Sequence, residues 1–123
     1  MEENMRRNCY GNYKDNECDI ESICCEGFVK EQFSLKTVAT IDPVIVYKSI
    51  GGNVTRGTVK VINLSSNTAI NFTVNGENIV VAPNQEAAIT ANALTTVTVA
   101  VNGPGRFAPV KLCFDIQVAA LGA

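Results

Sequence analysis

The chain has 123 residues, of which 46% are hydrophobic, and a formal net charge of −2, so we expect about one domain. No cluster of Lys and Arg indicates a nucleic-acid-binding surface, and no apolar stretch is long enough to span a membrane. The sequence contains no histidine, which removes the usual residue for acid–base and triad chemistry. We therefore expect neither enzymatic activity nor a cofactor.

The chain begins with a polar segment, residues 1–31, that we predict to be a flexible connector. This segment holds four basic and eight acidic residues, whereas residues 32–123 hold six basic and four acidic ones. The opposite net charges favour docking of the connector on the body of another copy, although a solvated tail would have the same composition. The segment has no apolar core of a classical secretory signal.

Four of the five cysteines lie in this connector, and two of them are adjacent. Neighbouring side chains on an extended backbone point in opposite directions, so Cys24 and Cys25 are better placed for two different partners than for each other. An odd number leaves one thiol over in a closed intrachain framework. Zinc is the alternative, but histidine and Cys-x-x-Cys spacing are both missing. Disulfides formed outside the reducing cytosol are therefore favoured, and the five residues are Cys9, Cys18, Cys24, Cys25 and Cys113.

From Phe33 onward the sequence alternates between apolar and polar residues, with breaks at Pro, Gly and Asn. This pattern predicts eight strands, at residues 33–41, 44–50, 54–64, 68–74, 79–82, 86–91, 95–101 and 109–119. Asn75-Gly76 is the strongest hairpin signal, because both residues accept the positive φ of a type I′ turn. No amphipathic helix separates the strands, so residues 32–123 are predicted to form an all-β, eight-stranded antiparallel jelly-roll sandwich.

The alternation also assigns the faces of the first and last strands. One face of the first strand is lined by Phe33, Leu35, Thr37, Ala39 and Ile41. In the last strand the apolar row predicted to face the core is Val110, Leu112, Phe114, Ile116 and Val118. Cys113 then shares the opposite face with Lys111, Asp115 and Gln117, so we expect an accessible thiol there. The alternative is a buried, inert cysteine.

The Cys24-Cys25-Glu26-Gly27 junction, the Cys-bearing connector before it, and the small domain ending in a Cys-bearing strand together resemble the endospore appendage subunits of spore-forming bacteria. The resemblance implies a jelly roll whose copies join by β-augmentation and whose connectors reach other subunits through disulfides. It makes Cys9, Cys18, Cys24, Cys25 and Cys113 the candidate intermolecular cross-links. It also implies a fibre on the spore surface, built from copies of this chain as a helix or stacked rings, with other appendage subunits as further candidate partners.

Chain dimensions are compatible with such an assembly. A connector of about 25 residues reaches roughly 80 Å when extended, and the edge strands of an open sandwich can pair with another copy. Two alternatives remain, a jelly-roll ligand-binding module and a coat or shell module that does not form fibres. Deletion of the connector separates a fibre subunit from a binding module, because only the fibre subunit should lose its function.

Overall fold

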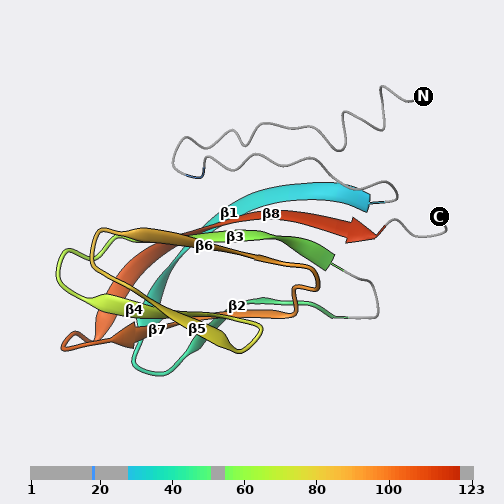
Figure 1. Cartoon of the computed structure of the whole chain (residues 1–123). Coiled ribbons are helices and arrows are strands. Elements are labelled where there is room, and N and C mark those ends of the chain that lie inside the picture. Colours follow the sequence, from blue (N-terminus) through green and yellow to red (C-terminus); the bar gives the residue numbers. More distant parts are fainter. Residues whose placement is uncertain (1–17, 19–27, 51–54, 120–123) are drawn as a thin grey trace.

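The computed structural model describes residues 18, 28–50 and 55–119. These residues form eight β-strands and no helix (Figure 1). The strands are β1 (Phe28–Thr40), β2 (Val44–Lys48), β3 (Thr55–Asn63), β4 (Ala69–Val74), β5 (Glu77–Val81), β6 (Glu86–Ala91), β7 (Thr96–Asn102) and β8 (Phe107–Ala119). All eight predicted strands are therefore confirmed, with ends that differ by a few residues.

The strands form two four-stranded antiparallel sheets (Figure 1), and both sheets contribute residues to one hydrophobic core. The strand orders are β1-β8-β3-β6 in one sheet and β2-β7-β4-β5 in the other. Within each sheet alternate side chains point toward the opposite sheet, as the period of two requires. In β3, for example, every second residue from Thr55 to Asn63 is buried.

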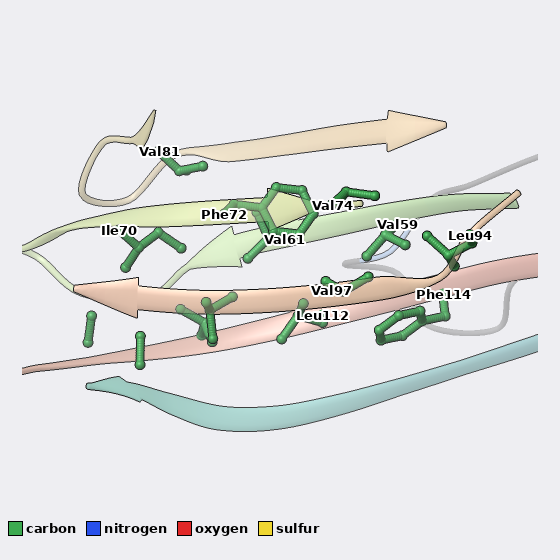
Figure 2. Packing of buried hydrophobic residues seen from close by; sticks show 14 of the residues in the cluster. Val59, Val61, Ile70, Phe72, Val74, Val81, Leu94, Val97, Leu112 and Phe114 are labelled. Atoms are coloured by element: carbon green, nitrogen blue, oxygen red, sulfur yellow. The ribbon is translucent and has the colours of Figure 1, made fainter. Parts of the chain in front are cut away.

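The core is built from aliphatic side chains of both sheets and a small aromatic group (Figure 2). Phe114 stacks on Phe33 with ring centroids 4.7 Å apart, and Tyr47 approaches Phe114 at 5.5 Å. The predicted apolar row of the last strand is confirmed, because Val110, Leu112, Phe114 and Ile116 are buried and Val118 packs against the cluster.

The first strand differs from its prediction at both ends. It begins at Phe28, before the alternation at Phe33, because β1 pairs with β8 over its full length, from Phe28 opposite Ala119 to Thr40 opposite Phe107. It stops at Thr40, so Ile41 lies beyond the strand and is 66% exposed. The prediction that Ile41 belongs to the first strand, on the same face as Phe33 and Ala39, was therefore wrong.

The Asn75-Gly76 hairpin is confirmed. Both residues have positive φ, 53° and 86°, which is the backbone that a type I′ turn requires. The Asn75 Oδ1 atom accepts hydrogen bonds from the backbone amides of Thr95 and Thr96. The turn between β4 and β5 is thus tied to the start of β7.

Candidate functional site: a disulfide on the outer face of a sheet

The candidate site lies on the face of the β1-β8-β3-β6 sheet that points away from the core. Cys113 is in the middle of β8, opposite Ser34 of β1 and opposite Lys60 of β3. Because Leu112 and Phe114 face the core, the side chain of Cys113 points to the outer face. This orientation agrees with the alternation of the sequence.

Cys113 is joined to Cys18 by a disulfide within the chain. Their Cα atoms are 5.6 Å apart, and the two residues are separated by 95 positions in the sequence. Lys60 supports the same contact, because its Nζ donates a hydrogen bond to the backbone oxygen of Cys18 at 3.1 Å. Lys60 also pairs with Glu86 on the neighbouring strand β6, at 3.1 Å. A covalent bond and a hydrogen bond thus hold Cys18 against the sheet.

Buried polar side chains continue along the outer face of β8. The Nζ of Lys30 lies 3.6 Å from the Oδ2 of Asp115, and the two side chains are only 3% and 0% exposed. The Nε2 of Gln32 donates to the same carboxylate oxygen at 3.3 Å. Lys111 and Gln117 are also buried, at 5% and 6%. A buried ion pair needs further polar contacts to compensate for its lost hydration, and Gln32 supplies one of them to Asp115. The outer face of β8 is therefore shielded from solvent at these residues.

The expectation of an accessible thiol at Cys113 was wrong. Cys113 and Cys18 are both 0% exposed, and the Cys113 sulfur is bonded to that of Cys18. Alternation identifies the face of a strand but not what covers that face. Lys30, Gln32 and Lys60 were not selected from the sequence, because surface charges and amides of this kind carry no signal of their own.

The structure brings together two of the five candidate cysteines, Cys18 and Cys113. Cys9, Cys24 and Cys25 lie outside the described residues, and their role as cross-links stays a prediction. The division into a connector, 1–31, and a domain, 32–123, stays a prediction as well.

Two further observations concern the described residues alone. No three His, Cys, Asp or Glu side chains among them are grouped so that they could hold a metal ion. None of their elements is a helix long and apolar enough to cross a membrane.

Comparison with known families decides the relationship of this chain. The model of the endospore appendage family matches residues 16–120. The chain belongs to the endospore appendage family. The matched range contains Cys18 and Cys113 as well as the Cys24-Cys25 pair, whereas Cys9 lies before it.

A solved structure supports the same fold for this family member. It comes from a study of Bacillus endospore appendages, described as a novel family of disulfide-linked pili. The two chains superpose with a TM-score of 0.65 at 18% identity, covering 82% of this chain and 99% of the other. A search of curated proteins finds no match. At this level of identity the structural likeness concerns the fold.

Proposed function

We propose that this chain is a structural subunit, not an enzyme, that assembles with copies of itself into a disulfide-linked, pilus-like fibre on the spore surface. The observation that carries the proposal is the family match over residues 16–120. The similar solved structure belongs to appendages that are described as disulfide-linked pili. The Cys18–Cys113 disulfide lies within one chain, and it supports the proposal because it joins a cysteine of the predicted connector to a cysteine of the body.

The strand order supports the finer assignment to a jelly roll. The β4–β5 hairpin stays within one sheet, and each other pair of consecutive strands lies in different sheets. This alternation places β1 beside β8 and β2 beside β7, as expected for a chain that winds as a long folded ribbon. Jelly rolls have eight strands in two such sheets.

The edges of both sheets support joining by β-augmentation. Three of the four edge strands carry exposed β-branched residues, which are Val29 and Val38 on β1, Ile45 on β2 and Val80 on β5. Soluble β-proteins commonly protect their edges with charges, prolines or bulges, because unpaired backbone groups template pairing with another chain. Exposed apolar residues at edge strands favour strand addition by a second copy, and β2 also has a register shift between Ile45 and Tyr47 in its pairing with β7.

The outer face of β8 supports covalent joining. A site that binds Cys18 of its own chain by a disulfide and a Lys60 hydrogen bond offers the same contacts to the connector of another copy. The net charges of −4 for residues 1–31 and +2 for residues 32–123 favour that docking. Cys9, Cys24 and Cys25 are then further candidates for cross-links between copies.

Electron microscopy of the purified protein, after incubation with a low concentration of glutathione that lets disulfides exchange, tests the proposal, together with denaturing gels run with and without reductant. We expect fibres or stacked rings on the grids. We expect a high-mass ladder that collapses to a 13.2 kDa band when reductant is added. Empty grids and a single monomer band on both gels would contradict the proposal.

A further inference from the structure

The disulfide at the site uses the sulfur that fibre assembly would need. Cys113 is bonded to Cys18 of the same chain, and neither residue is exposed. While this bond is intact, Cys113 cannot join another copy, and Cys18 is held on its own body. A closed subunit and a linked subunit are therefore mutually exclusive states of one site.

We propose that the Cys18–Cys113 disulfide is a latch that keeps the free subunit closed, and that thiol–disulfide exchange opens it for assembly. This inference rests on the proposed function, because it concerns how the same site passes from its own connector to that of another copy.

The exchange needs no net oxidant. A cysteine thiolate of another copy attacks the Cys113 sulfur, a new S–S bond forms between the two copies, and Cys18 leaves as a thiolate. One disulfide is lost and one is gained, so the attacking thiol is oxidised while the Cys18 sulfur is reduced. A small thiol such as glutathione starts the same sequence by forming a mixed disulfide that a second thiolate then resolves.

The contacts around Cys18 explain why the closed state would persist until a thiol arrives. Both cysteines are buried, so an attacking thiolate must first gain access to their sulfurs, and access controls the rate of exchange. Lys60 restrains Cys18 through the hydrogen bond to its backbone oxygen, and Glu86 positions Lys60 from the adjacent strand. An intramolecular partner also has a high effective concentration, which favours closure when subunits are dilute.

The first experiment establishes the closed monomer. Full-length protein purified without thiols should give a monomer whose Cys18 peptide is linked to the Cys113 peptide. Cleavage after Glu17 and Glu21 separates Cys18 from the Cys24-Cys25 pair, so mass spectrometry of the digest assigns the bond without ambiguity. A monomer in which Cys18 is not bonded to Cys113 would overturn the proposal.

The second experiment follows fibre growth from this monomer by light scattering, electron microscopy and non-reducing gels. With oxidised glutathione present as the oxidant for free thiols, Cys18→Ser should form covalent multimers without a lag, whereas the closed monomer should form them only slowly until reduced glutathione is added below stoichiometric amounts. Equal rates of cross-linking in the two proteins before the reduced thiol is added would overturn the latch and leave the proposed fibre function intact. Absence of fibres from both proteins under all thiol conditions would overturn both proposals.

A pair of variants that retain all five cysteines tests the restraint on Cys18. Lys60→Met removes the hydrogen bond to Cys18, and we expect the Cys18–Cys113 bond to be reduced by glutathione about tenfold faster. Glu86→Gln is the matched control, because it removes the ion pair of Lys60 but leaves the hydrogen bond to Cys18. Its rate should stay closer to that of the unchanged chain. Identical rates in all three proteins would show that Lys60 does not hold the latch.

Discussion

At the scale of single residues, the side chain of Asn63 makes hydrogen bonds that an apolar side chain could not make. It is fully buried at the end of β3, where its Nδ2 donates to the carbonyl oxygens of Thr68, Val81 and Ala82. Its Oδ1 accepts from the amide of Ser65 at 3.0 Å. Since buried backbone groups need partners, Asn63 joins β3 to the segments beside β4 and β5, and therefore one sheet to the other.

We expect Asn63→Ala to lower the free energy of unfolding by about 1–3 kcal/mol, because it leaves buried carbonyl groups and an amide unsatisfied. Urea unfolding of the monomer with its disulfide intact measures the change. Asn78→Ala is the control, since the amide of Asn78 makes only exposed hydrogen bonds, and it should change stability by less than about 0.5 kcal/mol. Equal effects of both substitutions would contradict this role of Asn63.

Gly57 permits the close approach of β3 and β8. A Cβ atom at this position would lie 2.5 Å from the backbone oxygen of Asp115 and 2.6 Å from the Cα of Ile116. Neither backbone atom can move without disturbing the strand pairing, so Gly57→Ala should destabilise the chain by about 1–3 kcal/mol. The thermal unfolding midpoint of the monomer measures this loss of stability. Thr58→Ala is the control, because it loses only an exposed hydrogen bond to Thr90, and its midpoint should stay near that of the unchanged chain. A similar decrease of the midpoint in both variants would contradict this role of Gly57.

At the scale of elements, the strands and the Asn75-Gly76 turn were predictable because their signals are local. Alternation requires only that one face of a strand is buried, and the turn requires only two residues that tolerate positive φ. The outer face of β8 was not predictable in the same way. Lys111, Asp115 and Gln117 have the composition of a solvated face, yet they are buried. Their burial depends on contacts with residues distant in sequence, such as Lys30 and Gln32 of β1.

The edge strands permit a direct test of strand addition. We expect Ile45→Lys on β2 or Val80→Lys on β5 to shorten fibres and to weaken association between copies by about tenfold, or about 1.4 kcal/mol. A lysine at an edge must lose water when another strand pairs with it, and such charges protect natural edges. Fibre length by electron microscopy and the critical concentration for growth give the two readouts.

The control for the edge variants is Thr98→Lys. Thr98 lies opposite Ile45 on β7, an inner strand of the same sheet, so the substitution adds the same charge to the same face away from the edge. It should leave association nearly unchanged. If Thr98→Lys weakened fibres as much as Ile45→Lys, the copies would meet through the face of the sheet and not through its edge.

At the scale of the whole molecule, two kinds of contact have separate tasks in the proposed fibre. Strand addition at the edges extends the assembly through many weak backbone hydrogen bonds, which denaturants disrupt. Disulfides to the outer face of β8 make dissociation require reduction in addition to unfolding. A homopolymer can repeat both contacts with one sequence, because a head-to-tail interface that does not close upon itself continues as a filament.

The variant Cys113→Ser separates these two tasks. We expect it to retain the strand edges and form fibres, but these fibres should disperse in denaturant alone, whereas fibres of the unchanged chain should also require a reductant. Electron microscopy after denaturant treatment and non-reducing gels of the same samples measure the difference. The control is Ser34→Ala, because Ser34 lies on β1 directly opposite Cys113. This variant keeps all five cysteines, so its fibres should still resist denaturant without reductant. Fibres of Cys113→Ser that survive denaturant without reductant would show that the covalent links between copies do not depend on Cys113.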